Sequence, residues 1–335
     1  MKYFVTGATG FIGERLVQRL VGRGDTVHAL YRSEAKAAAI VHPLVRLFKG
    51  DITDVASLER GMTGCDGVFH AAAYAKVWAK DPSTYRRLNL DATRTILDLA
   101  RRLGGPKVVF TSTGGVIGPS SGGAADEKTV RTVPFFNDYE RTKAAAEEVA
   151  RGFAALGQDV VIVNPTRVFG PGLISESNSV TRMIKLYRTG RFRILPGNGR
   201  SVGNYVFIDD VVDGHILAME KGRSGERYIL GGPNVSYLEF FAELAKITGR
   251  SRRMVRLPLP VMLAASGAMH LFARWFGIPP LITPEWVRKY LYDWVLSSDK
   301  AVRELGYHMT PLAEAFRKTV AWLDEGENAR SAERG

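Results

Sequence analysis

Cysteine is almost absent from this sequence, since Cys65 is the single cysteine among 335 residues. One cysteine cannot close an intrachain disulfide or supply a thiolate cluster to a metal ion. The six histidines show no ligand spacing either, so the sequence predicts no metal site. The N-terminal stretch MKYFVTG turns directly into a strand pattern without the features of a signal peptide. These absences predict a protein of the reducing cytoplasm.

Apolar segments of membrane-spanning length are missing too. The run LPLPVMLAASGAMHLFA at 257–273 has 17 residues and ends at Arg274, whereas a spanning helix needs about 20 apolar positions. The basic cluster RSRRMVR at 250–256 precedes this run, so two interpretations stay open. The favoured one is an ordinary lid helix beside a charged turn. The other is a peripheral contact with an anionic membrane surface.

Acidic residues are fewer than basic ones, 34 against 46, which gives a formal net charge of +12. Such an excess can indicate nucleic acid as a partner. Most of it is dispersed here, and the densest cluster, at 250–256, has no interleaved aromatic residues on which bases could stack. We therefore expect a globular protein that does not bind nucleic acid.

Short β-branched or aromatic runs alternate with helical stretches in the first half of the chain. Helix-like segments begin at FIGERLVQ, DPSTYRRL and DYERTKAA. Strand-like runs lie at 2–6, 26–31, 45–49, 67–70, 107–112 and 160–164. This alternation predicts a parallel sheet with helices on both faces, which is a doubly wound α/β Rossmann fold.

The alternation breaks near residue 170, where FGPGLISESN reads as a loop. We expect residues 1–170 to form a dinucleotide-binding domain. Residues 171–335 are then expected to form a smaller, mostly helical substrate-binding lid. The strand-like runs NYVFI and ERYIL predict that residues 203–230 return to the central sheet.

A glycine-rich turn, TGATGFIG, follows the first predicted strand and places Gly7, Gly10 and Gly13 three residues apart. Glycines at a strand-to-helix turn permit a tight turn and close approach of a phosphate to backbone N–H groups. They also let the helix pack closely on the strand. The position of the turn inside a βαβ unit predicts dinucleotide binding.

The second predicted strand ends at Tyr31 and Arg32, where dinucleotide-binding proteins distinguish their two cofactors. An Asp or Glu near this point binds a free ribose 2′-hydroxyl, whereas a 2′-phosphate requires an arginine. Arg32, with Lys36 after it, can hold a phosphate with two donors and stack on adenine. We therefore predict NADP(H) over NAD(H), although Glu34 keeps NAD(H) open.

Seven ordered motifs together resemble the extended short-chain dehydrogenase/reductase superfamily over almost the whole chain. They are TGATGFIG, GDITD, FHAAAY, FTSTGGVIG, YERTK, NPTRVFGPG and FIDDV. The sequence is most similar to the dihydroflavonol reductase-like branch, with its 3β-hydroxysteroid dehydrogenase and cinnamoyl-CoA reductase types. It is also similar to bacterial hopanoid-associated sugar epimerases. Fold analogy alone does not settle the substrate.

The resemblance implies that Tyr139 is the catalytic acid/base and Lys143 its partner, four residues apart on one helical face. We expect Lys143 to lower the pKa of Tyr139 and to hold the nicotinamide ribose. Thr113 matches the hydroxyl that orients the substrate oxygen. Successive strand residues point in opposite directions, so Thr113 and its neighbour Ser112 should not both face the site.

The resemblance also implies a set of binding residues. Those expected at the cofactor are Gly7, Thr9, Gly10, Phe11, Ile12, Gly13, Arg32, Lys36, Asp51, Ile52, Ala71, Ala72, Ala73, Tyr139, Lys143, Pro165 and Val168. Those expected at the substrate are Tyr74, Val77, Trp78, Thr113, Gly114 and Phe169. Asn89 matches an asparagine that shapes the active-site backbone.

These expectations favour an NADP(H)-dependent reductase that converts a hydrophobic ketone or aldehyde to an alcohol. One alternative is an NAD-dependent sugar-nucleotide epimerase or dehydratase, in which Arg182, Arg191 and Arg193 would clamp the pyrophosphate. Another is a nucleotide-sensing protein without turnover. The superfamily resemblance further implies a homodimer.

Overall fold

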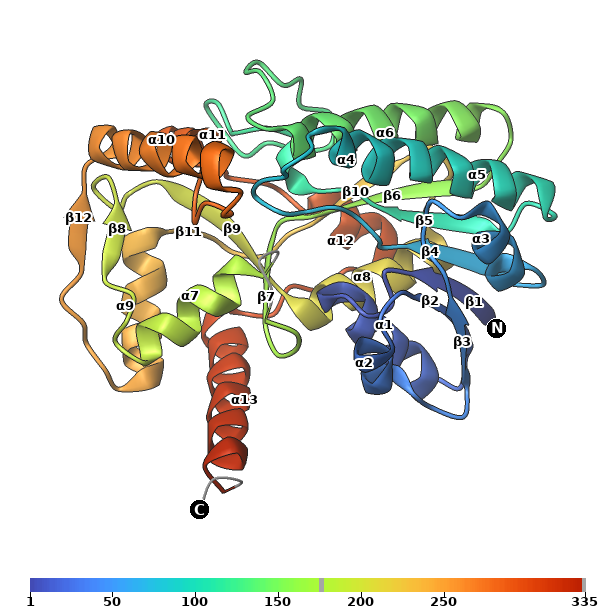
Figure 1. Cartoon of the computed structure of the whole chain (residues 1–335), viewed down its shortest axis with the longest axis horizontal. Coiled ribbons are helices and arrows are strands. Elements are labelled where there is room, and N and C mark those ends of the chain that lie inside the picture. The colour runs from blue at the N-terminus through green and yellow to red at the C-terminus, as the bar shows by residue number, and fades with distance from the viewer. Residues whose placement is uncertain (175–177, 333–335) are drawn as a thin grey trace.

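A seven-stranded parallel sheet forms the centre of the computed structural model, which describes residues 1–174 and 178–332 (Figure 1). The strand order is β10-β6-β5-β4-β1-β2-β3. These strands are β1 (Lys2–Thr6), β2 (Thr26–Tyr31), β3 (Val45–Lys49), β4 (Gly67–His70), β5 (Lys107–Thr111), β6 (Val160–Pro165) and β10 (Arg227–Leu230). The doubly wound parallel sheet predicted from the alternating pattern is confirmed.

Helices cover both faces of this sheet (Figure 1). One face carries α1 (Phe11–Gly22), α8 (Ile208–Lys221) and α12 (Asp299–Leu305), and the other α3 (Val55–Met62), α5 (Ala92–Arg102) and α6 (Asp138–Ala155). Neighbouring strand residues therefore enter different cores: Phe4 packs with α3 and α5, whereas Val5 packs with α1 and α8. Both faces are buried, as the continuous apolar character of the strands requires.

Short helical segments connect the main elements. They are α2 (Glu34–Ala37), the 3-10 helix Ala38–Ile40, α4 (Ser83–Tyr85), the π-helix Arg86–Asp91 and the 3-10 helix Gly114–Val116. The π-helix continues from α4 directly into α5. A π-helical turn within a longer helix is often found at a functional site.

The remaining elements form a second part beside the sheet (Figure 1). Its strands are β7 (Arg167–Phe169), β8 (Ile194–Pro196), β9 (Val202–Phe207), β11 (Asn234–Ser236) and β12 (Val255–Leu257). Its helices are α7 (Ser179–Arg188), α9 (Tyr237–Thr248), α10 (Leu259–Phe276), α11 (Pro284–Arg288), the 3-10 helix Lys289–Leu291 and α13 (Leu312–Ala332). This part is mostly helical, but it also contains two small sheets.

The expectation that residues 203–230 return to the central sheet is only half right. The second of the two strand-like runs becomes β10, which pairs in parallel with β6. The first becomes β9, which pairs with β7 and β11 in a separate three-stranded sheet. Residue pattern identifies both runs as strands, but strand partners depend on contacts far along the chain.

The order of the central strands reverses between β1 and β4, and ligands of such sheets bind at this point, beyond the carboxyl ends of the strands. The glycine turn lies here. Gly7 has φ +71°, and a Cβ on it would lie 2.7 Å from the backbone nitrogen of Ala72. A Cβ on Gly13 would lie 2.0 Å from the carbonyl oxygen of Gly7. The turn therefore closes only with glycine.

The close contact at Gly13 leads to a test of the turn. Gly13→Ala should lower the free energy of unfolding by about 1–3 kcal/mol, because the new methyl group overpacks backbone that cannot move aside. Gly22→Ala is the matched control, since a Cβ at Gly22 meets nothing within 4 Å. It should be neutral or stabilising by about 0.4–1 kcal/mol. Urea unfolding measures both, and equal effects would contradict this account of the turn.

Candidate active site

The catalytic candidates lie at the start of α6. Asn137 caps this helix, its side chain accepting a hydrogen bond from the backbone N–H of Glu140. Tyr139 follows in the first turn and is partly buried, and Lys143 lies one turn later on the same face with 0% exposure. The Nζ atom of Lys143 donates a 2.6 Å hydrogen bond to the carbonyl oxygen of Thr111 and lies 4.1 Å from the ring centre of Phe110. The helix thus brings both side chains to the end of β5.

Thr113, just beyond β5, is the hydroxyl that faces Tyr139. Its side chain interacts with the Tyr139 hydroxyl and accepts a hydrogen bond from the backbone of Gly115. Ser112 is turned away, since its Oγ atom donates a 2.5 Å hydrogen bond to Glu147. Only one of the two neighbouring hydroxyls therefore points toward Tyr139, as the alternation of extended backbone requires.

Burial shifts the pKa values of this pair in opposite directions. It raises the pKa of Tyr139 to about 12, which the hydrogen bond with Thr113 partly opposes. It lowers the pKa of Lys143 to about 7, which the nearby carboxylate of Glu147 partly opposes. The expected lowering of the Tyr139 pKa by Lys143 is therefore wrong for this structure, because burial disfavours both phenolate and ammonium. Tyr139 is a phenol at neutral pH.

Asn89 connects the π-helix to the catalytic helix. Its side-chain oxygen accepts a 2.7 Å hydrogen bond from the backbone N–H of Tyr74, and its side-chain nitrogen donates to the hydroxyl of Thr142. With 1% exposure, it has little contact with solvent. Asn89 thus holds the segment after β4 against α6, which agrees with the backbone-shaping role that the resemblance implies.

The glycine turn fits the diphosphate of a dinucleotide. Gly10 is the N-cap of α1, and no side chain occupies the cap position by hydrogen bonding. The first N–H groups of α1 are therefore left for an anion, which the helix dipole also favours. Ala71 and Ala72, after β4, lie against Gly7 and leave no room for a larger side chain there. Thr9, Phe11 and Ile12 belong to this same turn and the start of α1.

The adenosine end is expected at the carboxyl ends of β2 and β3. Arg32, 73% exposed, places Nη1 3.3 Å from the carboxylate of Asp51. Glu34 is paired elsewhere, with Lys49 at 3.1 Å and with the hydroxyl of Tyr31 at 3.2 Å. Hydrogen bonds from Thr53, together with Arg32, hold the pKa of Asp51 below its usual value despite partial burial. Arg32 and Glu34 are thus both exposed to solvent, and each is paired with a group of opposite charge.

The other residues expected at the cofactor differ in burial. Ile52 is partly buried and packs on the core beneath α3 and α5, while Lys36 and Ala73 are exposed. Pro165 ends β6 and is buried, and Val168, in β7, is partly buried.

The expected substrate walls differ in accessibility. Tyr74 donates its hydroxyl to the carbonyl oxygen of Trp78 at 3.2 Å, and both residues are partly buried. Val77 lies between them and is also partly buried. Gly114 is buried, and a Cβ on it would approach the side chain of Leu296 to 3.2 Å. Leu296 therefore belongs to this neighbourhood.

Phe169 was expected among the substrate walls, and the structure corrects this. Its side chain is 1% exposed, with its ring centre 5.5 Å from that of Phe316 on α13 and 6.2 Å from that of Phe207. Because residues alternate along β7, Phe169 points into the core that joins the sheet to the second part.

A buried ionic cluster beside Tyr139 was not predicted. Glu140, 0% exposed, accepts a 2.6 Å hydrogen bond from Lys289 and lies 3.0 Å from Arg131. Burial lowers the pKa of Lys289, and Glu140 opposes this shift. Lys289 also lies 4.5 Å from the ring centre of Trp286 and 4.6 Å from that of Trp294. Since Glu140 and Lys289 are 149 residues apart, no local pattern could have paired them.

Glu147 forms a second buried hub that the sequence analysis missed. One carboxylate oxygen accepts hydrogen bonds from Ser112 and from the side chain of Asn164. The other lies 3.4 Å from Arg151 and 3.5 Å from Arg227. Helical spacing could have identified Glu147 from the sequence, because it follows Lys143 by four residues on the same face.

Arg167 is a third missed residue, although it lies inside the recognised motif NPTRVFGPG. Its Nη1 atom donates hydrogen bonds of 3.1 Å to the hydroxyls of Tyr205 and Tyr237. No carboxylate of the described residues lies within ion-pair distance of it. Tyr290 lies beside this group, with its ring centre 5.7 Å from that of Tyr237.

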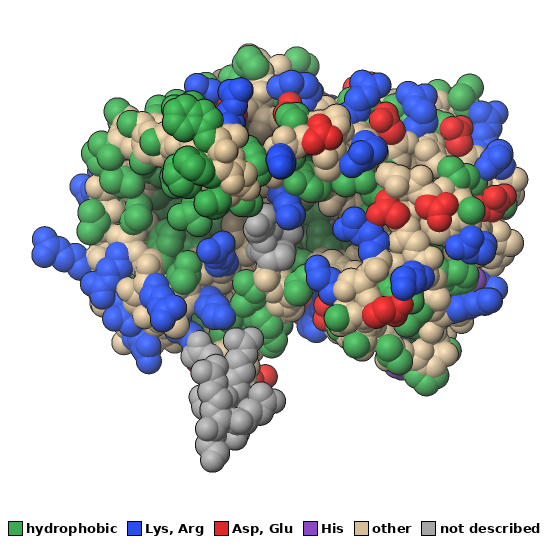
Figure 2. Space-filling model, in the orientation of Figure 1, with side chains coloured by type: hydrophobic (Ala, Val, Ile, Leu, Met, Phe, Trp, Pro, Cys, Tyr) green, Lys and Arg blue, Asp and Glu red, His purple; other side chains and the backbone are tan. Residues whose placement is uncertain are grey.

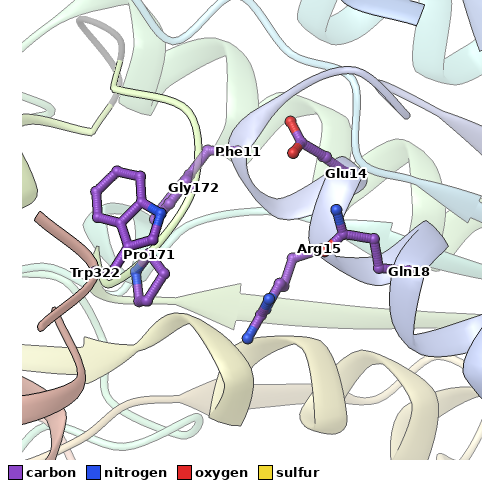
Figure 3. A pocket seen from close by; sticks show the side chains of 7 residues that line it. All are labelled: Phe11, Glu14, Arg15, Gln18, Pro171, Gly172 and Trp322. Atoms are coloured by element: carbon purple, nitrogen blue, oxygen red, sulfur yellow. The ribbon is translucent and has the colours of Figure 1, made fainter. Parts of the chain in front are cut away.

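One cavity opens beside the glycine turn (Figure 3). It has a volume of about 150 Å³ and lies between α1, the loop at 171–172 and α13. Phe11 and Gly172 lie on its wall, and a Cβ on Gly172 would meet the Phe11 ring at 3.3 Å. None of the catalytic candidates lines it, so this cavity is not the place where chemistry is expected.

No group of three metal-ligating side chains occurs within residues 1–174 and 178–332. Likewise, none of the helices that the structure describes is long and apolar enough to cross a membrane.

Known proteins resemble the chain in both sequence and fold. A putative dihydroflavonol 4-reductase from Synechocystis is 32% identical, with 96% of this chain and 94% of the relative covered. A 4-hydroxy-2-methyl-3-oxo-4-farnesyl-3,4-dihydroquinoline-1-oxide ketoreductase from Stigmatella aurantiaca is 32% identical, with 92% of each covered. The crystal structure of DesIV, a dTDP-glucose 4,6-dehydratase from Streptomyces venezuelae with NAD and TYD bound, has a TM-score of 0.79, 25% identity and 98% coverage of each chain.

These likenesses agree with the resemblance found in the ordered motifs. Residues 3–231, which include the glycine turn and all three catalytic candidates, match the NAD dependent epimerase/dehydratase family. The chain therefore belongs to this family of extended short-chain dehydrogenases/reductases and is an enzyme that acts on CH–OH or C=O groups with a nicotinamide dinucleotide.

Proposed function

We propose that this enzyme is an NADP(H)-dependent reductase that converts a hydrophobic ketone or aldehyde to an alcohol. The observation that carries the proposal is the position of Tyr139: its hydroxyl faces Thr113 beyond β5, and Lys143 lies one turn away on the same face of α6. A tyrosine hydroxyl is protonated at neutral pH, and burial raises its pKa further. Reduction of a carbonyl consumes a proton, whereas oxidation of an alcohol would first require the phenolate.

Each residue of the proposed site has a separate role in this reaction. The bound cofactor supplies the hydride. Tyr139 donates its hydroxyl proton to the carbonyl oxygen, and the Thr113 hydroxyl orients that oxygen. Lys143 lies on the same helical face, and its pKa of about 7 leaves it about half protonated at pH 7; the protonated form stabilises the phenolate left behind. Asn89 keeps the segment at Tyr74 in place against α6.

The hydrophobic substrate is supported by position and by a relative. The residues proposed around the reacting carbonyl are mostly apolar or aromatic: Tyr74, Val77, Trp78 and Leu296. A polyol would need several buried polar partners to be discriminated. The name of the Stigmatella aurantiaca relative describes reduction of a ketone that carries a farnesyl chain.

Replacement of the proton donor tests the proposed chemistry. Tyr139→Phe should lower kcat for carbonyl reduction by about 10²–10⁴-fold, the usual contribution of a positioned acid. Its Kd for NADPH should stay within about threefold, because a single hydroxyl is removed and the glycine turn is untouched. Turnover with a hydrophobic ketone panel and fluorescence titration of NADPH measure the two quantities. Retained turnover would refute the assignment of Tyr139.

The preference for NADP(H) rests on the adenosine end. The exposed guanidinium of Arg32 uses one nitrogen on Asp51 and keeps its other donors for a 2′-phosphate, while Glu34 is paired with Lys49 and Tyr31. A free ribose 2′-hydroxyl would need a carboxylate at this place. An exposed arginine at the end of β2 therefore supports NADP(H).

Charge reversal at Arg32 tests this preference. Arg32→Glu should weaken NADPH binding at least tenfold and leave NADH binding within about threefold, because the lost interaction is with the 2′-phosphate. Arg101→Glu, an exposed arginine of α5, is the matched control and should change neither. Isothermal titration with both cofactors decides the matter. Equal losses for NADPH and NADH would remove the argument.

Arg167 is the observation that favours a second candidate function. Its Nε and Nη2 atoms have no hydrogen-bond acceptor among the described residues, and neither is sealed from solvent. These free donors could bind a phosphate, as in a sugar-nucleotide epimerase or dehydratase. Arg182, Arg191 and Arg193, the clamp expected from the sequence, are all exposed. The solved DesIV structure holds NAD and TYD on a similar fold.

The nucleotide that copurifies with the protein separates the two functions. An epimerase must reuse the hydride that it removes, and it therefore retains its cofactor, whereas a reductase exchanges its cofactor each turn. We expect denatured, freshly purified protein to release less than about one tenth of an equivalent of nucleotide. Stoichiometric NAD⁺ in the supernatant, identified by chromatography, would instead favour the sugar-nucleotide function. A cytoplasmic homodimer is a further proposal that rests on the family resemblance.

A further inference from the structure

The apolar run at 257–273 does not join the core as an ordinary lid helix would. It forms most of α10, an 18-residue helix in which only Ser266 and Ala273 are buried. Five of its large apolar side chains and two from the following segment are unusually exposed. They are Val261 (51%), Leu271 (55%), Phe272 (50%), Trp275 (80%), Phe276 (62%), Ile278 (56%) and Leu281 (78%).

We call these seven residues the α10 face. Phe272 and Phe276 lie one turn apart with ring centres at 4.3 Å, so they form one aromatic surface. Figure 2 shows hydrophobic side chains gathered over α10 and α11 at one end of the molecule. Single exposed apolar residues are ordinary, but a contiguous patch of this kind usually marks an interaction site.

The charge around the α10 face has one sign. Residues 244–284 contain five arginines and one lysine but no aspartate or glutamate. Arg253, Arg256 and Arg274 are exposed and form no ion pair with any described residue. In Figure 2, Lys and Arg side chains lie beside the hydrophobic end, in the region of β8 and β12. Apolar surface and unneutralised cations therefore occur together.

Apolar surface combined with positive charge favours some binding partners of the α10 face over others. A second copy of the chain packed on the same face would bring the same arginines against one another, and like charges disfavour such a dimer. An anionic bilayer accepts both features, because aromatic and aliphatic side chains enter the acyl boundary while arginines contact the headgroups. No described helix can cross a membrane, so the contact would be peripheral.

We propose that the α10 face and the arginines of 250–256 and Arg274 dock this enzyme on an anionic phospholipid surface. The helix lies in the plane of the interface, with Phe272, Trp275 and Phe276 inserted below the headgroups. The arginines supply the attraction to the anionic lipid, which weakens as salt screens it. This inference is independent of the substrate proposed above, since it uses none of the residues of the active site.

Vesicle cosedimentation of the full chain tests the proposal. The enzyme should pellet with vesicles of phosphatidylcholine containing about 30% phosphatidylserine at low salt, and at least tenfold less with phosphatidylcholine alone. Binding should fall as NaCl rises toward about 0.5 M. Phe272→Ser combined with Trp275→Ser should reduce the partition coefficient at least tenfold. Arg253→Gln combined with Arg256→Gln should reduce it by roughly fivefold for each charge, the usual contribution of one cation.

Matched variants on other surfaces provide the controls. Val130→Ser removes an apolar side chain that is 82% exposed, and Arg101→Gln removes an exposed charge of α5. Both should bind vesicles as the unaltered chain does. Failure to pellet with anionic vesicles would overturn the proposal. So would salt-resistant binding that ignores the arginine substitutions, or a dimer in light scattering that Trp275→Ser dissociates while vesicle binding is absent.

Discussion

Three ionisable side chains of α6 are fully buried, and the geometry of the active site depends on how their charges are compensated. Glu140, Lys143 and Glu147 are each 0% exposed. A buried charge that loses its partner costs on the order of several kcal/mol, so each one restricts the elements around it. Glu147 binds the ends of β5 and β6, and Glu140 binds the second part of the chain through Lys289. Rotation of α6 would break all of these contacts, so Tyr139 is held in place by its neighbours.

The same burial sets the chemistry that the site favours. Removal from water raises the pKa of Tyr139 and lowers that of Lys143, so Tyr139 carries its proton at neutral pH. The fold distributes the charged groups: Arg32 and Lys36 lie at the adenosine end, and the buried pair of Glu140 and Lys289 lies beside Tyr139. The proposed hydrophobic substrate therefore rests on the apolar and aromatic residues expected at its walls.

Much of the nucleotide-binding half was predictable because its signals are local. Runs of β-branched residues identify each central strand, and TGATGFIG identifies the turn after the first one. The positions of Thr113 and Tyr139 followed from motifs, and the alternation of extended backbone separated Thr113 from Ser112. The remaining features depend on distant contacts. Lys289 reaches Glu140 across 149 residues, and β9 pairs with β7 instead of the central sheet.

The α10 face shows what the spacing of apolar residues cannot predict. Apolar residues at helical spacing predict a helix correctly, but the pattern alone cannot say whether a core or another surface covers it. Phe169 shows the converse case, since a motif placed it near the site while strand alternation turned its ring into the core. In both cases the residue types predicted the element correctly. They did not predict which way the side chains point.

The π-helix at Arg86–Asp91 restricts where related chains can gain or lose residues. Each residue removed from a helix rotates everything beyond it by about 100°. Asn89 bonds to Tyr74 on one side and to Thr142 on the other, so a deletion within this segment would turn its side chain away from both. Loops elsewhere can gain or lose residues with little effect on the core. Homologous sequences should therefore show insertions and deletions around this helix, but not inside it.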